Sequence, residues 1–213
     1  DQHKKEIIHS YDAVILAIGV QGNTEALGLE NINITVEKHQ IQVNEYNQTQ
    51  HTHIYAIGDI AGAPCLAHKA SHEGIMVAEH IKGLNPYPIN KKNIPSCTYA
   101  YPQVASVGMT EAQVNDIKND VTIGMFPLMA NGKALSVGEP EGFIKTIFDK
   151  NTGELLGAHM IGHEVTEMIH GYVIAKQLET TETELIHTIF PHPTLSEAMH
   201  DSVLSAFGQA IHY

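Results

Sequence analysis

The stretch EGFIKTIFDKNTGELLGAHMIG, residues 141 to 162, indicates the fold of the larger part of this chain. Two apolar segments, Phe143 to Phe148 and Leu155 to Ile161, flank the cluster DKNTG, whose residues favour turns. This pattern is typical of two antiparallel strands joined by a short connection. The sequence therefore predicts a β-hairpin here.

Further strands and helices are expected on both sides of the hairpin. Strand-like segments cover residues 96–108 and 121–128, and the capping-type sequence TEAQ at Thr110 opens a short helix between them. Longer helices are expected over 164–178 and 194–210. Apolar residues recur every three or four positions on one face of the last helix: Leu195, Met199, Val203, Phe207 and Ala210. Together these segments predict an antiparallel sheet backed by helices, an α+β domain.

A different pattern precedes this domain. The segment NPYPINKKNIP, residues 85–95, contains three prolines and predicts a domain boundary. Before it, the apolar run at 13–18 is typical of a buried parallel strand, and HIYAIGD at 53–59 predicts a second one. LAHKASHEGIMVAEHIKG predicts a helix that ends at Gly83. Parallel strands need sheet neighbours joined by crossover connections, so we expect the chain to be the back part of a longer protein.

Composition excludes several kinds of partner. The 213 residues carry a formal net charge of -12, and all 12 basic residues are lysines. Nucleic-acid binding relies on basic side chains that neutralise phosphates, so neither nucleic acid nor an anionic membrane is an expected partner. No apolar run reaches the roughly 20 residues of a membrane span, and no signal peptide is evident, which favours a cytoplasm-like compartment. The two cysteines, Cys65 and Cys97, lie far apart and indicate no disulfide framework.

Two further motifs concern ligands. HEVTEMIH at 163–170 brings histidine and glutamate to one helix face but departs from HExxH, and we assign no metal site to the chain. In IGDIAGAPCLAHKASHEG an aspartate follows a predicted strand and precedes a helix, as in the nucleotide-facing crevices of α/β proteins. Asp59 could accept hydrogen bonds from sugar-like hydroxyls, and the backbone N–H groups of Leu66, Ala67 and His68 could donate to a ring oxygen. A plain turn before a capped helix remains the alternative.

FPHPTLSEAM, residues 190–199, allows two interpretations. Thr194 and Glu197 have the spacing of a helix capping box. The Glu197 carboxylate could also orient the imidazole of His192 for proton transfer. The two interpretations are compatible, because Thr194 and Glu197 can start the helix while Pro193 holds His192 just outside it.

Taken in order, these motifs resemble the C-terminal part of the pyridine nucleotide-disulfide oxidoreductases. YDAVILAIG, IYAIGD with LAHKASHEG, YPQVASVGMTEAQ, the hairpin sequence and HPTLSEAM all match segments of that family. LAHKA favours the dihydrolipoamide dehydrogenases over the glutathione reductase-like members. The resemblance implies the end of an NAD-binding domain at 1–22, the C-terminal segment of an FAD-binding domain at 23–92, and a dimerisation domain at 93–213. The implied fold is an α+β dimerisation domain preceded by part of an α/β FAD/NAD-binding region.

The resemblance also implies roles for individual residues near the cofactors FAD and NAD. Asp59 would bind the ribityl chain of FAD, and Gly19 would lie near NAD. Four residues would lie along the flavin: Cys65, Leu66, Ala67 and His68. Val20 stands where the family often has arginine, so no contact is inferred at that position.

For the catalytic residues, the resemblance implies that His192 handles the thiol proton of dihydrolipoamide and that Glu197 orients it. In the family this histidine serves the flavin and disulfide of the partner subunit, which makes a homodimer the expected assembly. Protein-bound dihydrolipoamide would be oxidised to lipoamide with NAD as acceptor. The expected partners are the lipoyl domain and the E2 subunit of 2-oxo acid dehydrogenase complexes, in bacterial cytoplasm or a mitochondrial matrix.

The family's redox-active C-x4-C and its two GxGxxG elements precede the matching region. We therefore expect this chain by itself to retain no FAD and to be inactive. A stand-alone dimerisation or docking module is one alternative, and part of a glutathione reductase-like enzyme is another.

Overall fold

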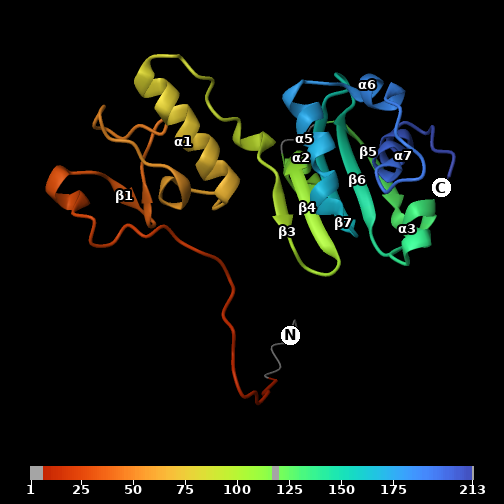
Figure 1. Cartoon of the computed structure of the whole chain (residues 1–213), viewed down its shortest axis with the longest axis horizontal. Coiled ribbons are helices and arrows are strands. Elements are labelled where there is room, and N and C mark those ends of the chain that lie inside the picture. The colour runs from red at the N-terminus through yellow and green to blue at the C-terminus, as the bar shows by residue number, and fades with distance from the viewer. Residues whose placement is uncertain (1–6, 117–119, 213) are drawn as a thin grey trace. The chain divides into compact units, whose positions relative to one another are not determined.

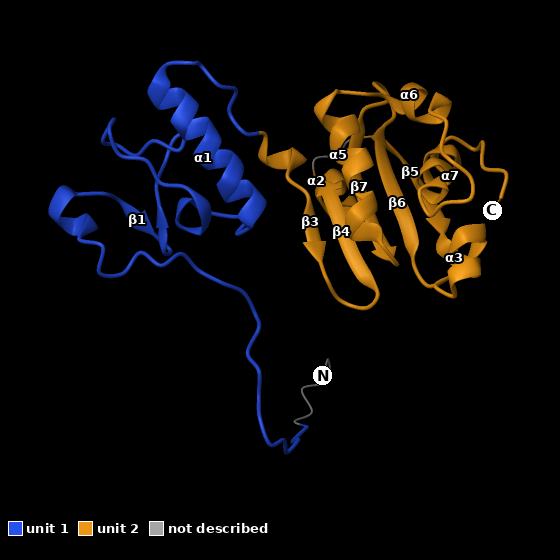
Figure 2. Cartoon of the chain, in the orientation of Figure 1, with its two compact units in different colours: residues 1–89 blue, residues 90–213 orange. Residues whose placement is uncertain are grey.

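The chain divides into two compact units in the computed structural model, which describes residues 7–116 and 120–212. Unit 1 comprises Asp1–Ile89 and unit 2 comprises Asn90–Tyr213 (Figure 2). The boundary predicted between residues 92 and 93 lies three residues beyond this division. No helix in the described part of the chain is long and apolar enough to span a membrane.

Unit 1 is built around one long helix. Its elements are the 3-10 turns η1 (Leu29–Ile32) and η2 (Gly58–Ala61), the two-residue strands β1 (Val36–Glu37) and β2 (Gln40–Ile41), and the helix α1 (Ala67–Lys82) (Figure 1). The predicted helix is confirmed. It ends because Gly83, with φ 79, adopts the left-handed conformation and donates its N–H to the carbonyls of the last turn. A small apolar cluster forms the core of the unit: Ile34, Ile41, Ala56 and Ala61.

Both strands predicted in unit 1 are wrong. The apolar run at 13–18 forms no strand, and its side chains are exposed, to 91% at Ile15. Residues 53–59 contribute a single isolated bridge, between Tyr55 and Gln48, before the chain turns into η2. A strand forms only where neighbouring backbone accepts its hydrogen bonds, and no strand of the described residues pairs with either segment. The small β1–β2 hairpin was not predicted.

Unit 2 contains a five-stranded antiparallel sheet. Its strands are β3 (Ser96–Thr98), β4 (Gln103–Gly108), β5 (Val121–Pro127), β6 (Phe143–Asp149) and β7 (Leu155–Gly162). Their order across the sheet is β3-β4-β7-β6-β5. The predicted hairpin is therefore confirmed as β6–β7, and it lies inside the sheet with β4 on one side and β5 on the other.

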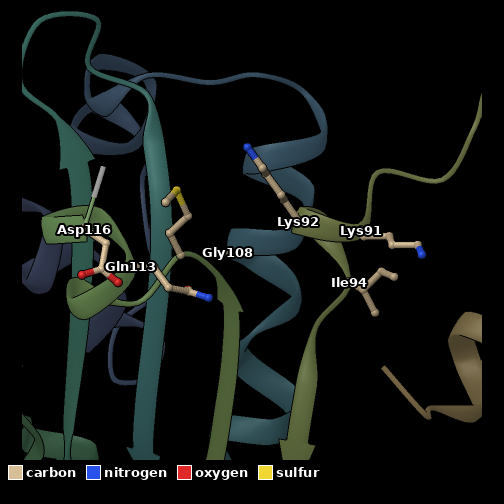
Figure 3. Close-up of a pocket in the computed structure, with 7 residues that line it drawn as sticks. Lys91, Lys92, Ile94, Gly108, Gln113 and Asp116 are labelled. Atoms are coloured by element: carbon tan, nitrogen blue, oxygen red, sulfur yellow. The ribbon is translucent and has the colours of Figure 1, made fainter. Parts of the chain in front are cut away.

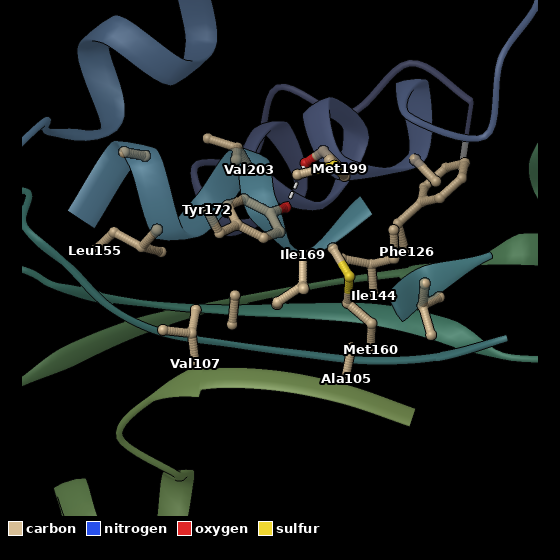
Figure 4. Close-up of a cluster of buried hydrophobic side chains, with 14 of the residues drawn as sticks. Ala105, Val107, Phe126, Ile144, Leu155, Met160, Ile169, Tyr172, Met199 and Val203 are labelled. Carbon is tan, nitrogen blue, oxygen red and sulfur yellow. Dashed lines mark hydrogen bonds between the residues drawn. The ribbon is translucent and has the colours of Figure 1, made fainter. Parts of the chain in front are cut away.

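The core of unit 2 consists of rows of inward side chains across this sheet (Figure 4). In one row Ala105 pairs with Met160, Met160 with Ile144, and Ile144 with Phe126. These side chains lie on one face of the sheet, because alternate residues of a strand point to the same side. All of them are buried. Tyr172 and other residues of the covering helices complete the cluster, so the hydrophobic effect holds the sheet and helices together.

Six helices accompany the sheet in the described part of unit 2. They are α2 (Glu111–Asp116), α3 (Gly132–Val137), α4 (Val165–Met168), α5 (His170–Gln177), α6 (Glu182–His187) and α7 (Glu197–Ala206), with 3-10 turns η3 (Lys91–Asn93) and η4 (Leu128–Ala130). The expected helix at 164–178 is divided at Ile169, and the helix expected over 194–210 is shorter at both ends. The helices α3 and α6 were not predicted, since six residues are too few to establish a helical period.

The last helix, α7, lies unusually close to β5. A Cβ atom added to Gly124 would meet the backbone oxygen of Ser202 and would lie 2.7 Å from the backbone nitrogen of Ala206. Gly124 stands in a row with Thr146, whose hydroxyl bonds both the carbonyl and the hydroxyl of Ser202. The absence of a side chain at Gly124 thus lets α7 seat directly on the sheet.

Candidate functional site

The described part of unit 2 contains a histidine–carboxylate pair at the entrance to α7. Nδ1 of His192 lies 2.8 Å from Oε1 of Glu197. The His192 side chain is 78% exposed, whereas that of Glu197 is 27% exposed. An ionised carboxylate only accepts hydrogen bonds, so Nδ1 must carry the hydrogen. In the neutral ring this leaves Nε2 as the basic nitrogen of an accessible imidazole.

The second oxygen of Glu197 fixes the backbone before the helix. Thr194 donates its N–H to Oε2 of Glu197 at 2.8 Å, as half of a capping box requires. The other half does not form, because the Thr194 hydroxyl donates to the carbonyl of Pro191 at 2.7 Å and Ser196 is the N-cap residue. A complete capping box occurs instead at Thr181 and Glu184, in α6.

These contacts affect the ionisation of Glu197. Partial burial by itself raises the pKa of this carboxyl, but hydrogen bonds from the Thr194 N–H and the His192 ring, together with the nearby charges of His192 and His212, bring the pKa below its ordinary value of 4.5. The carboxylate is therefore ionised at neutral pH. It can hold the His192 tautomer and stabilise a positive charge on the ring.

The helix that presents Glu197 is anchored by polar contacts as well as by packing. The buried hydroxyl of Tyr172 donates to the carbonyl of Met199 at 2.9 Å (Figure 4). The ring of His200 stacks on Phe190 with centroids 5.2 Å apart, and its Nε2 lies 2.8 Å from the carbonyl of Ile186. These contacts hold α7 and the segment before His192 against α5 and α6, which gives the pair a rigid support.

The candidate cofactor residues lie in unit 1, where a buried ion pair holds the loop that contains Asp59. Nζ of Lys69 lies 3.0 Å from Oε1 of Glu73 and donates to the carbonyls of Gly58 and Gly62. Oε2 of Glu73 accepts the N–H of Gly58 at 2.7 Å. The loop on both sides of Asp59 is thereby tied to α1, while Asp59 itself is exposed and can accept hydrogen bonds.

The other predicted cofactor residues occupy the start of α1 or the preceding segments. Cys65 is a free, half-buried cysteine, Ala67 begins the helix, and His68 is exposed. The N–H of Leu66 is not free as expected, because it donates to Pro64 O at 3.1 Å within the loop. Gly19, with φ 137, lies in the exposed segment after the apolar run. A Cβ atom added to Gly19 would have no other atom of the described chain within 4 Å.

Three residues that support these sites were not singled out in the sequence. Lys69 and Glu73 have the i, i+4 spacing of a helical ion pair, which was an available signal, although their burial was not. Asn131 precedes α3 and caps it by accepting the Ala134 N–H at 2.9 Å. An asparagine just before a helix is a recognised start signal. Its hydrogen bond to the carbonyl of Thr194, 63 positions away, cannot be read from the sequence.

The pair at His192 is separate from a hollow in unit 2. That hollow, of about 530 Å³, lies by η3 and α2 (Figure 3). Its lining residues are Lys91, Lys92, Ile94, Gly108, Met109, Gln113 and Asp116. None of the predicted site residues borders it, so it offers no support for their roles.

The helix face at HEVTEMIH does not assemble a metal site. Nε2 of His163 lies 3.9 Å from Oε1 of Glu164, and the helix is divided at Ile169. Within residues 7–116 and 120–212, no group of three or more His, Cys, Asp or Glu side chains could hold a metal ion.

Comparison with known families assigns the fold. The model of the dimerisation domain of the pyridine nucleotide-disulphide oxidoreductases matches residues 94–203, and a second model, described as pyridine nucleotide-disulphide oxidoreductase, matches residues 2–74. The chain belongs to the pyridine nucleotide-disulphide oxidoreductase family. The predicted α+β class of the C-terminal unit is thus confirmed.

Individual relatives carry names that are more specific than the family. The chain is 55% identical over 204 residues to a dihydrolipoyl dehydrogenase of Zymomonas mobilis, covering 95% of this chain and 44% of the relative. It is 54% identical to a dihydrolipoyl dehydrogenase of Rhizobium etli, covering 94% of this chain and 42% of the relative. The chain therefore spans less than half the length of these relatives.

Solved structures agree with the family. LpdA from Mycobacterium tuberculosis superposes with a TM-score of 0.80 and 27% identity, covering 86% of this chain and 40% of that structure. The HOCl-induced flavoprotein disulfide reductase RclA from Escherichia coli gives a TM-score of 0.81 at 28% identity, covering 88% of this chain and 43% of that one.

Proposed function

We propose that this chain is the C-terminal part of a dihydrolipoyl dehydrogenase, which oxidises protein-bound dihydrolipoamide to lipoamide with NAD as acceptor. The observation that supports this proposal most directly is the 2.8 Å hydrogen bond between Nδ1 of the exposed His192 and Oε1 of the ionised Glu197. The identity to relatives of that name supports the same assignment.

The pair suits a thiol substrate. A thiol must lose its proton before its sulfur can take part in disulfide exchange. With Nδ1 bonded to Glu197, Nε2 of His192 can accept that proton, and the carboxylate stabilises the resulting imidazolium. Because the ring is largely exposed, the substrate can reach it from solvent or from a partner subunit.

The residues of unit 1 fit a flavin. Asp59 presents an exposed carboxylate on a loop fixed by Lys69, and α1 offers the N-terminus of a 16-residue helix at Ala67. Asp59 would hold the ribityl hydroxyls, with Cys65 and His68 beside the ring system. When bound, FAD would pass the electrons of the substrate thiols to NAD.

A homodimer is part of the proposal. The face of the sheet opposite the core exposes several large apolar side chains, and an obligate interface would cover such a surface. These residues are Val104, Ile123, Met125 and Phe143. In this assembly His192 would act on the disulfide and flavin of the second subunit. The lipoyl domain and E2 subunit of a 2-oxo acid dehydrogenase complex are the proposed further partners, in bacterial cytoplasm or a mitochondrial matrix.

Substitution of His192 in the full-length enzyme tests the proposal. His192→Gln should lower dihydrolipoamide turnover by about 10²- to 10⁴-fold, the usual contribution of a general acid–base group. Glu197→Gln should lower it less, by roughly 10- to 100-fold, because the imidazole remains but loses its orienting charge. His187→Gln, at another exposed histidine, is the matched control and should retain activity. Wild-type turnover in His192→Gln would refute the acid–base role.

The 213-residue chain itself offers a second test. We expect it to purify without flavin and to show no dihydrolipoamide oxidation, because most of the cofactor contacts would come from segments that it does not contain. Stoichiometric flavin absorbance in the purified chain would contradict this expectation.

A dimerisation or docking module is the competing class of function, favoured by the exposed apolar sheet face. Light scattering of the chain at several concentrations separates the possibilities, since a strict monomer excludes the module. A glutathione reductase-like parent is distinguished by assaying the full-length enzyme with dihydrolipoamide and with glutathione disulfide.

A further inference from the structure

The segment before α7 depends on a contact from a distant part of the chain. Thr194 is held at three points: its N–H donates to Glu197, its hydroxyl donates to Pro191, and its carbonyl accepts from Nδ2 of Asn131 at 3.1 Å. The first two bonds join residues three positions apart. The bond from Asn131 spans 63 positions, so it ties the His192 segment to the region after β5.

Asn131 is well placed to act as a fixed anchor. It is 4% exposed, and both ends of its amide are used. Its Oδ1 accepts the N–H of Ala134 at the start of α3, its Nδ2 donates to Thr194, and its own N–H donates to the carbonyl of Leu128 at 2.9 Å. The side chain is thus set by η4 and α3, and it cannot turn without breaking a buried hydrogen bond.

We propose that Asn131 is a positioning residue for the His192–Glu197 pair, acting through the carbonyl of Thr194. This inference rests on the proposed acid–base function of His192. The site suits an amide, because Oδ1 accepts one hydrogen bond while a separate atom, Nδ2, donates another. Aspartate can cap α3 but cannot donate to Thr194, and serine can cap α3 but is too short to reach it.

This difference gives two variants that separate positioning from helix capping. Asn131→Ser introduces no charge, and Asn131→Asp keeps the size of the side chain. Asn90→Asp is the matched control, because Asn90 also caps a turn through Oδ1 by accepting the Lys92 N–H at 3.1 Å, but is exposed.

NMR of the 213-residue chain measures the effect directly. In both Asn131 variants the Thr194 N–H should exchange with solvent about five- to tenfold faster, which corresponds to the net free energy of one hydrogen bond. The Nδ1 resonance of His192 should shift toward the value of a mixture of the two ring tautomers. The Ala134 N–H should keep its protection, and Asn90→Asp should change none of these signals. Unchanged Thr194 and His192 signals in Asn131→Ser would overturn the inference. Equal loss of protection at Ala134 and Thr194 would also overturn it, because capping alone would then explain the effect.

Turnover of the full-length holoenzyme tests the functional consequence. Asn131→Ser should lower kcat several-fold with little change in KM and should alter the pH profile of kcat, as misplacement of the base predicts. Normal turnover in His192→Gln would refute the proposed function, whatever the NMR result. Loss of turnover in His192→Gln combined with wild-type kcat and pH profile in Asn131→Ser would refute the positioning role alone.

Discussion

The two units hold themselves together by different interactions. Within the described residues, the core of unit 2 has 17 buried apolar residues, contributed by a five-stranded sheet and by the helices packed on it. The apolar core of unit 1 has four in the part that the structure describes, and the buried pair Lys69–Glu73 links η2 to α1. The apolar run at 13–18 stays exposed in unit 1 instead of adding to its core.

This contrast bears on what each unit can do alone. Burial of apolar surface in unit 2 supplies a rigid base for His192 and Glu197. In unit 1 a network of hydrogen bonds around two charges fixes the geometry of the loop at Asp59, and such a network tolerates few changes. Hydrogen exchange monitored by mass spectrometry, which reports each unit separately, is the measurement that compares them.

The largest expected effect follows from removing one charge of the pair. Lys69→Met leaves Glu73 buried without its partner and should destabilise unit 1 by about 3–5 kcal/mol, while protection of β6 and β7 stays unchanged. The double variant Lys69→Met with Glu73→Leu should recover only part of the loss, because no charge remains buried but the Gly58 N–H and the Gly58 and Gly62 carbonyls lose these partners. If the amides of α1 keep full protection from hydrogen exchange in Lys69→Met, the buried ion pair is not what stabilises unit 1.

A smaller effect is expected from disturbing the packing of unit 2. Gly124→Ala places a methyl group against the backbone of α7 at Ser202 and Ala206, and should lower stability by roughly 1–3 kcal/mol. Gly132→Ala is the control, since a Cβ atom at Gly132 meets nothing within 4 Å. The two variants are compared by chemical denaturation, and equal stability would show that α7 does not need the close approach.

Removal of one hydrogen bond should cost less. Tyr172→Phe deletes the hydroxyl that donates to the carbonyl of Met199 at 2.9 Å and retains the buried ring. We expect a loss of about 1 kcal/mol in unit 2, measured by the same denaturation experiment. A loss above about 3 kcal/mol would mean that the ring itself has moved.

The smallest effect concerns pH. The pKa of Glu197 in the folded chain is below its ordinary value of 4.5. The ionised carboxylate therefore contributes fully to the stability of unit 2 above pH 4.5, and this contribution is lost as the pH falls through the lower folded-state pKa. His192→Gln should raise this pKa toward its ordinary value, because the charge of the imidazolium is removed. A carbon NMR titration of the Glu197 carboxyl measures the change, and an unaltered midpoint would show that the pair is not coupled.

Sequence patterns predicted most of unit 2. The β6–β7 hairpin and the antiparallel sheet were evident, as was the α1 helix in unit 1, because alternating or helical periods and turn residues act locally. The pair His192–Glu197 was also evident, since five positions around a helix start restrict the distance between the two side chains. The predicted strands at 13–18 and 53–59 failed because apolar composition cannot supply hydrogen-bonding neighbours.

The sequence by itself determined the β6–β7 hairpin and the antiparallel sheet of unit 2, the candidate acid–base pair and the resemblance to an oxidoreductase family. Only the tertiary structure decided that Lys69 and Glu73 are buried, that Gly124 admits α7, and that Asn131 holds Thr194 from 63 positions away. The physical reason is that local periodicity is written in neighbouring residues, whereas burial and long-range hydrogen bonds depend on which distant segments meet when the core forms.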